Sequence, residues 1–348
     1  MRIIFMGTPD FARDSLQALY EAKHEILMVV TNQDRPQGRG MKLIASPVKE
    51  YAVNNGLKIA QPEKIRNNLE FIQKVEALKP DVICVVAYGK ILPKEILDIP
   101  KLGCINVHGS LLPKYRGAAP IQWAVLNGDK TTGITTMYMD EGMDTGDMIL
   151  KKEVKIGEDE TTGELWDRLS NIGAELLVET LKQIENETAP RIPQDGEFSL
   201  APMLDKKMAK INWEEQTVLQ IKNLVRGLNP IMGAFTMLNG KKYKFWKVDV
   251  AESTEIFAGN LEVIKNGVIL VSDSRDGLFI KAKDGILKVL EIQGENAKRM
   301  NIHDFLRGNS IPEFSVFEWL LFQTKNNNNI LKINFAYDKI NQIVWGGN

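Results

Sequence analysis

Short apolar runs alternate with stretches of helical periodicity over about the first 180 residues, and this alternation constrains the fold more than any other feature. The run 81–87 (DVICVVA) is nearly all apolar, as expected of a strand that is buried on both faces. Further strand-like runs lie at 3–6, 26–31, 103–108 and 133–139, and helical patterns lie at 11–22 and 164–184. We therefore expect an α/β domain with a Rossmann-like, mostly parallel sheet that is covered by helices.

The pattern changes after residue 188. A segment that contains proline and glycine, 189–196, predicts a linker, and a helix is expected at 217–228. After Gly233 short strand patterns follow one another, and Asn239-Gly240 between two of them indicates a hairpin. This part of the chain therefore predicts a smaller, OB-like β-barrel. The expected organisation is a first domain at 1–188, a linker at 189–207, a barrel at 208–314 and a tail at 315–348.

The tail differs from both domains in composition. Its 34 residues include seven asparagines, four of them in the run 326–329, and six aromatic residues. Asparagine runs interrupt regular structure, and the apolar pieces at 317–322 and 330–335 lack helix caps. We expect a poorly ordered extension from Ser315 onward.

Composition excludes several classes of protein. The formal net charge is −1, so a nucleic-acid partner would have to bind a local basic patch. The only cysteines, Cys84 and Cys104, lie in apolar runs, which argues against a disulfide framework or a cysteine-rich zinc site and predicts a cytoplasmic protein. Three scattered histidines do not suggest a metal centre. No apolar run approaches the length of a membrane span, and the apolar N-terminal stretch is too short for a signal peptide.

Charge is divided unevenly along the chain. Residues 1–204 hold 24 basic and 29 acidic residues, a net charge of −5, whereas residues 205–314 hold 17 basic and 14 acidic residues, a net charge of +3. The lysines of the second part cluster at Lys206, Lys207 and Lys210 and at Lys241, Lys242, Lys244 and Lys247. A solvated surface explains such clusters as well as a binding patch does.

The segment 103–113 (GCINVHGSLLP) carries the strongest chemical signal. Asn106 and His108 are two residues apart at the end of an apolar strand, so their side chains emerge on the same face. Ligands of open α/β sheets bind beyond the carboxyl ends of the strands. An amide donor beside an imidazole suits a reaction that forms an oxyanion and moves a proton, although a histidine that only caps the strand end is an alternative.

A second signal is the loop 139–147 (MDEGMDTGD), in which four acidic residues and two glycines follow a strand. Such a loop can hold one carboxylate against a strand end, and Asp144 is the candidate to orient His108 or to relay a proton. Asp144-Thr145-Gly146 also matches the triplet of aspartic proteases, but a single-chain protease needs two such triplets. A magnesium loop is a further alternative, although no phosphate-binding motif accompanies it.

A third signal is the basic loop 34–42 (DRPQGRGMK), which follows the second strand. Its glycines predict mobility, and its arginines can clamp a phosphate or stack on a base. A flexible solvated loop is the alternative. Elsewhere, Gly7-Thr8-Pro9-Asp10 does not match the dinucleotide fingerprint, and Ser110 does not lie in the motif of serine hydrolases.

Together these segments resemble the folate-dependent formyltransferase superfamily. The similar stretches are 2–12, 34–43, 46–49, 81–94, 103–124, 139–148, 201–213 and 228–236. Asn-x-His-x-Ser-Leu-Leu-Pro with a later Asp-x-Gly-x-Asp-Thr-Gly is specific to the superfamily, and the basic loop with the barrel is similar to its tRNA-modifying branch. Gly109 replaces an alanine of the family pattern, a change that we expect to be tolerated. The tail has no counterpart, so truncation after Phe314 should leave formyl transfer intact.

The resemblance implies a reaction without a covalent enzyme intermediate or a metal. The donor would be 10-formyltetrahydrofolate, and the acceptor would be the α-amine of methionine on initiator tRNA, which is used in translation initiation. Asn106 and His108 would stabilise the oxyanion, and His108 and Asp144 would manage the proton. The folate would contact a set of residues in three loops: Val86, Ala87, Tyr88, Gly89, Ser110, Leu111, Leu112, Pro113, Asp140 and Gly142.

The resemblance also implies which residues meet the tRNA. Arg35, Arg39 and Lys42 of the basic loop would reach the end of the acceptor stem, with Arg39 as the main contact. Lys206, Lys207 and Lys210 would meet the phosphate backbone and make binding sensitive to salt. We expect a monomer. The alternatives are a formyltransferase acting on a nucleotide sugar or a glycinamide ribonucleotide, a non-catalytic RNA-binding protein, and an NAD(P)-dependent oxidoreductase.

Overall fold

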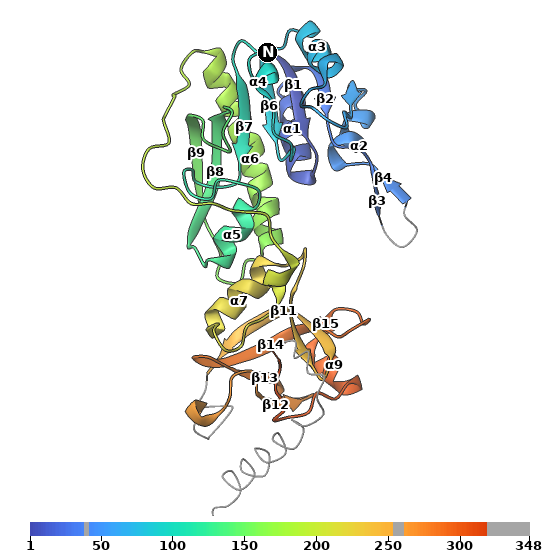
Figure 1. Ribbon diagram of the computed structural model, residues 1–348, viewed down its shortest axis with the longest axis vertical. Helices are drawn as coiled ribbons and strands as arrows, with labels where there is room; N and C mark the ends of the chain where they lie inside the picture. Colours follow the sequence, from blue (N-terminus) through green and yellow to red (C-terminus); the bar gives the residue numbers. More distant parts are fainter. Residues whose placement is uncertain (38–41, 253–260, 319–348) are drawn as a thin grey trace, which may run out of the picture. The chain divides into compact units, whose positions relative to one another are not determined.

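A computed structural model describes residues 1–37, 42–252 and 261–318 of the chain. It divides into two compact units, of which the first spans Met1–Asp205 and the second begins at Lys206 (Figure 1). Arg39 and residues 319–348 of the predicted tail lie outside the described residues. Among the described residues, no helix is long and apolar enough to cross a membrane.

A seven-stranded sheet forms the centre of the first unit, in the order β5-β2-β1-β6-β7-β8-β9. Its strands are β1 (Arg2–Gly7), β2 (Glu25–Val30), β5 (Ile59–Ala60), β6 (Val82–Val86), β7 (Cys104–His108), β8 (Thr131–Tyr138) and β9 (Met148–Lys155). The pairs from β5 to β7 are parallel, and β8 and β9 are added antiparallel. The prediction of a mostly parallel sheet is confirmed.

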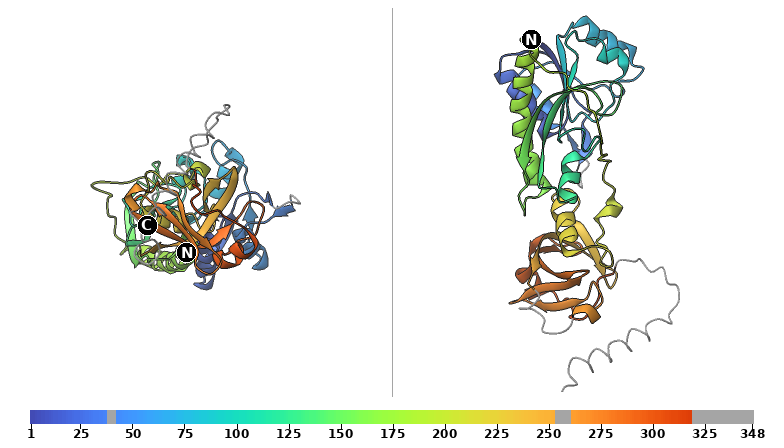
Figure 2. Two further views of the ribbon diagram at one scale, coloured as in Figure 1. Left: turned by 90° about the horizontal axis from the view of Figure 1, so that it is seen from below. Right: turned by 90° about the vertical axis from the view of Figure 1, so that its left-hand side faces the viewer.

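Helices cover both faces of this sheet. They are α1 (Asp10–Glu21), α2 (Pro47–Asn54), α3 (Leu69–Ala77), α4 (Lys94–Leu97), α5 (Pro120–Leu126) and α6 (Thr162–Glu185). Successive side chains of β1 point to opposite faces. Ile3 and Phe5 belong to the core that α1 and α6 cover, and Ile4 and Met6 belong to the core that α3 and α4 cover. The long helix α6 lies along one face of the sheet beside α1 (Figure 2).

The basic loop has more regular structure than the sequence predicted. Its arms form two short antiparallel strands, β3 (Arg35–Gln37) and β4 (Lys42–Ile44). At its base, Asp34 accepts a hydrogen bond from Lys49 Nζ at 2.6 Å and another from Gln61 at 2.9 Å. These two hydrogen bonds hold the pKa of Asp34 below its usual range.

The second unit is built on an antiparallel sheet in the order β10-β11-β14-β13-β12, with β15 on β14. The strands are β10 (Ala234–Leu238), β11 (Lys241–Ala251), β12 (Ile269–Asp273), β13 (Gly277–Ala282), β14 (Gly285–Gln293) and β15 (Met300–Asn301). The helical elements are η1 (Lys206–Ala209), α7 (Val218–Gly227), η2 (Leu261–Val263) and α9 (Ile302–Gly308). The predicted hairpin at Asn239-Gly240 joins β10 and β11.

The prediction that disorder begins at Ser315 is wrong for the first four residues of the tail. Phe317 is only 1% exposed and stacks on Trp213, with ring centroids 6.0 Å apart. The backbone of 314–318 also joins the two outer strands of the sheet, because Phe314 N–H donates to Ile269 in β12 and Glu318 N–H donates to Met237 in β10. The segment therefore closes the open side of the sheet.

Candidate active site

Asn106, His108 and Asp144 lie together beside the carboxyl-terminal half of β7. Asn106 Nδ2 is 3.4 Å from Asp144 Oδ1, and His108 Nδ1 is 3.6 Å from Asp144 Oδ2. The imidazole is 5% exposed, whereas the Asp144 side chain is 18% exposed. The structure thus places an amide donor, an imidazole and a carboxylate around one point, which suits a reaction that forms an oxyanion and transfers a proton.

The second nitrogen of His108 has a backbone partner. His108 Nε2 is 2.9 Å from the carbonyl oxygen of Tyr115. A carbonyl oxygen only accepts, so in the neutral imidazole the proton resides on Nε2. Nδ1 then carries the lone pair, faces Asp144 and is the nitrogen that can take up a proton from a reacting group.

The Asp144 carboxylate is positioned by the backbone conformation of Asp144 and by a hydrogen bond from Gly117. Asp144 has φ +54°, a left-handed conformation that aspartate tolerates better than most residues. Gly117 N–H donates to Asp144 Oδ2 at 2.9 Å. Earlier in the same loop, Asp140 Oδ1 accepts hydrogen bonds from Gly142 N–H and from the Thr145 hydroxyl, so this carboxylate stabilises the turn itself.

The residues expected to contact folate belong to three segments near the ends of β6, β7 and β8. After β6, Ala87 and Gly89 both have positive φ, at +44° and +76°, so the backbone turns sharply there. Asn32 Nδ2 donates to the carbonyl of Tyr88 at 3.0 Å. The Tyr88 side chain is 2% exposed, and burial raises the pKa of its hydroxyl to about 12.

The segment after β7 is held against the antiparallel strands. Leu112 N–H donates to the Thr135 hydroxyl at 3.1 Å, and this hydroxyl donates to the carbonyl of Ser110 at 2.7 Å. Lys151 Nζ donates to the carbonyl of Leu112 at 2.6 Å, and burial lowers the pKa of this lysine. These contacts fix the course of the backbone from Ser110 to Pro113 next to His108. Leu111 packs close to Gly133 of β8.

Comparison with known proteins identifies the family. Residues 1–181 match the formyl transferase model, and residues 203–310 match the model of the formyl transferase C-terminal domain. The methionyl-tRNA formyltransferase of Caldanaerobacter subterraneus subsp. tengcongensis is 49% identical over 319 residues, which are 91% of this chain and 100% of the relative. This chain belongs to the methionyl-tRNA formyltransferase family.

A second relative agrees with this family, and a solved structure agrees with the fold. The methionyl-tRNA formyltransferase of Clostridioides difficile is 51% identical over 312 residues, which cover 89% of this chain and 98% of the relative. A solved N-formyltransferase from Helicobacter canadensis, in complex with folinic acid and dTDP-3-aminofucose, is 20% identical with a TM-score of 0.61. That match covers 84% of this chain and 99% of the other, and at this identity it supports the fold.

In this formyltransferase, the structure describes only part of the residues predicted to meet tRNA. Arg35 lies exposed on β3, whereas Arg39 and the side chain of Lys42 lie outside the described part. Lys206 and Lys207 are exposed in η1, and Lys210 is half-buried after it. These lysines belong to the second unit, whereas Asn106, His108 and Asp144 belong to the first.

Sequence reasoning missed the residues that support Asn106, His108 and Asp144 (the trio) in this formyltransferase. Tyr115 and Gly117 contact it directly, and Gln194, from the predicted linker, donates to the carbonyls of Asp144 and Gly146. Tyr115 and Gly117 lie in a stretch that resembles the family, so their place after His108 was a usable signal. Gln194 lies 50 residues beyond Asp144 in a polar segment, where no local pattern marks it.

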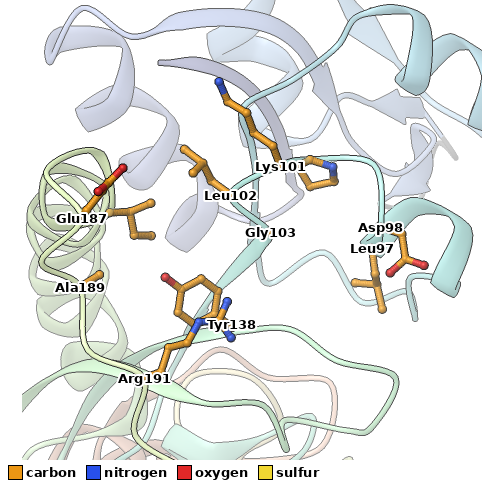
Figure 3. Close-up of a pocket in the computed structure, with 11 residues that line it drawn as sticks. Leu97, Asp98, Lys101, Leu102, Gly103, Tyr138, Glu187, Ala189 and Arg191 are labelled. Carbon is orange, nitrogen blue, oxygen red and sulfur yellow. The ribbon is translucent and has the colours of Figure 1, made fainter.

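A cavity lies at the opposite, amino-terminal end of β7 (Figure 3). Its lining comes from the 97–103 segment, the end of β8, the last turn of α6 and the chain after it: Leu97, Asp98, Pro100, Lys101, Leu102, Gly103, Tyr138, Ile184, Glu187, Ala189 and Arg191. The Arg191 guanidinium lies over the Tyr138 ring, 3.8 Å from its centroid. The lining does not include the trio. No group of three or more metal-ligating side chains is found among the residues that the structure describes.

Proposed function

We propose that this chain transfers the formyl group of 10-formyltetrahydrofolate to the α-amine of methionine on initiator tRNA. The observation that carries the proposal is the convergence of Asn106, His108 and Asp144, with distances of 3.4 and 3.6 Å to the carboxylate. The names of relatives that are about half identical over nine-tenths of the chain supply the transferred group and its acceptor, methionyl-tRNA.

The chemistry follows from the orientation of the three side chains. The uncharged amine attacks the formyl carbon, a carbon–nitrogen bond forms, and the carbonyl electrons move onto oxygen. Asn106 Nδ2 donates to this oxyanion from the start, and His108 donates to it once it is protonated, which lowers the barrier because both groups are already in place. The amine loses a proton to Nδ1 of neutral His108. The oxyanion then re-forms the carbonyl as the bond to folate N10 breaks, and the His108 imidazolium passes its proton to N10.

Asp144 stabilises the protonated imidazole in this scheme. Its Oδ2 lies 3.6 Å from His108 Nδ1 and also accepts from Gly117 N–H. Since a positive charge appears on the imidazole when it accepts the proton, a fixed carboxylate at this distance favours that state. The folate would lie along the backbone of residues 86–89 and 110–113, with Asp140 and Gly142 bordering it.

The tRNA would be bound by the basic loop and by the lysines at the start of the second unit. Arg35, Arg39 and Lys42 would contact the acceptor end, and Lys206, Lys207 and Lys210 would contact phosphates. Charge contacts of this kind release counterions, so the affinity for tRNA should fall steeply as salt concentration rises. Arg39→Ala should weaken use of limiting tRNA and spare folate binding.

The test is formyl transfer from 10-formyltetrahydrofolate to methionyl-tRNA, with initiator and elongator tRNA compared. Transfer confined to initiator tRNA is expected. His108→Ala should lower turnover by at least about 100-fold and leave tRNA affinity nearly unchanged, because a general acid–base residue contributes to the transition state. Transfer to a nucleotide sugar or a ribonucleotide in place of methionyl-tRNA would refute the assignment. An equal loss of tRNA affinity in the His108 variant would refute the catalytic role.

A further inference from the structure

The predicted linker is attached to the active site by specific hydrogen bonds. Residues 189–205 belong to the first unit, and Ile192 pairs with Met148 at the start of β9. Two residues later, Gln194 Nε2 donates to the carbonyl oxygens of Asp144 at 2.8 Å and of Gly146 at 2.9 Å. One amide group thus uses both of its N–H bonds on the loop that carries the Asp144 carboxylate.

The other end of the same amide holds a second loop. Gln194 Oε1 accepts from Arg116 Nε at 2.9 Å. Arg116 lies between Tyr115, whose carbonyl contacts His108, and Gly117, whose N–H contacts Asp144. Gln194 therefore joins the two loops that orient the carboxylate and the imidazole.

The chain after Gln194 continues to support the Tyr115–Gly117 loop. Ser199 Oγ accepts from Tyr115 N–H at 2.9 Å, and the Ser199 carbonyl accepts from Arg116 N–H at 2.8 Å. Ala201 N–H donates to the carbonyl of Arg116. Gly117 has φ +123°, and a Cβ built on it would lie 2.8 Å from the Ala201 carbonyl oxygen, so only glycine fits between this segment and Asp144.

We propose that Gln194 is a positioning residue for the formyl transfer, acting through Asp144. The inference rests on the proposed function, because it concerns the same trio. Asp144 has a left-handed backbone, and the neighbouring residues 141–143 and 145 are exposed, so the loop is held by its hydrogen bonds, among them the two from Gln194, more than by packing. Without the two bonds from Gln194, the carbonyls of Asp144 and Gly146 would bind water, and only Gly117 N–H and Asn106 would still direct the Asp144 carboxylate.

Two substitutions separate the two ends of the amide. Gln194→Ala removes the acceptor for Arg116 and the two N–H donors to the 139–147 loop. Gln194→Glu keeps an acceptor for Arg116 and removes only the two donors. Both variants should lower kcat roughly 10- to 100-fold, the effect expected when a residue that orients a catalytic group is lost. The KM for tRNA should stay within about twofold of wild type, since the lost interaction serves the transition state. Gln17→Ala, an exposed glutamine on α1, is the control and should leave kcat unchanged.

A double-mutant cycle tests the route through Asp144. In single-turnover reactions with full-length protein, Gln194→Ala should reduce the rate of wild type but have little further effect on the Asp144→Asn variant. Additive losses would overturn the inference. Wild-type kcat for Gln194→Glu would overturn it as well, because that variant lacks the donors.

A readout without substrate separates this inference from the proposed function. Hydrogen exchange of the 139–147 segment should speed up in Gln194→Ala and Gln194→Glu and stay unchanged in Gln17→Ala. If wild type does not formylate methionyl-tRNA, the proposed function fails, and this measurement alone decides whether Gln194 holds the loop. Unchanged exchange in both Gln194 variants would overturn the positioning role.

Discussion

Phe317→Ala should destabilise the second unit by about 4 kcal/mol, within the range of roughly 3 to 5 kcal/mol found when a buried phenylalanine is replaced by alanine. The side chain is 1% exposed, so nearly all of its apolar surface is removed from water by folding. It contacts three other rings, those of Trp213, Tyr243 and Phe245, with centroids 5.9–6.0 Å away. The rings of Trp213 and Phe245 are themselves buried, so the space left by the substitution cannot collapse without moving the turn and the strand that carry them.

The assay is native-state hydrogen exchange of peptides from β11 and β14, because two units need not unfold in one transition. Glu318→Ala is the matched control: its side chain is exposed on the same segment, and it should change stability by no more than about 0.5 kcal/mol. If Phe317→Ala and Glu318→Ala have the same effect, the assignment of Phe317 to the core is wrong.

The burial of Phe317 changes the expected position at which the tail can be removed. A chain that ends at Glu318 keeps Phe317 and the hydrogen bonds to Met237 and Ile269, and it should retain formyl transfer. A chain that ends at Phe314 loses Phe317 and should lose stability in the second unit. Equal stability of the two truncated chains, measured by the same exchange experiment, would contradict the closing role of 315–318.

Two further predictions concern the first unit. A Cβ at Gly109 would lie 2.9 Å from Ile121 Cγ1 and 3.1 Å from Ile121 Cδ1, so Gly109→Ala should cost about 1–3 kcal/mol by overpacking. The loss should be smaller in an Ile121→Ala background, which lacks both atoms; additive losses in chemical denaturation would argue against the clash. A hydrogen bond from Arg2 N–H and the nearby Lys101 hold the pKa of Asp81 below its usual range. Ionised Asp81 therefore stabilises the folded state at pH values above its ordinary pKa. This stabilisation is lost as the pH falls through the lower pKa of the folded state. Asp81→Asn should therefore flatten the acid limb of the stability–pH profile, and an unchanged limb would refute this.

The central sheet and the grouping of Asn106, His108 and Asp144 could be predicted because most of their signals are local. An apolar run such as 81–87 reports burial on both faces by itself, and the spacing of Asn106 and His108 places both side chains on one face. Asp144 needed one more step, because it lies 38 residues from Asn106 and only the acidic loop marked it.

The missed features depend on partners that are distant in sequence. Gln194 accepts a hydrogen bond from Arg116, which lies 78 residues earlier in the sequence. Phe317 stacks on Trp213, which lies near the start of the second unit in the sequence. In the sequence, Gln194 lies among proline and glycine, and Phe317 lies just before an asparagine-rich stretch, so local periodicity assigned both to irregular structure. Both side chains are held in place by contacts with residues that are distant in sequence, and a local sequence pattern does not report such contacts.

The attachment of residues 194–201 to the candidate active site determines where an N-terminal fragment of this protein can end. The sequence predicts that the first domain ends at residue 188, and a fragment that stops there would contain Asn106, His108 and Asp144. It would lack Gln194, Ser199 and Ala201, and therefore the groups that hold the two loops around the trio. An N-terminal fragment meant to bind folate or to serve as a donor of this site in a chimera has to extend to Asp205. A partner domain fused to it can begin only after that residue.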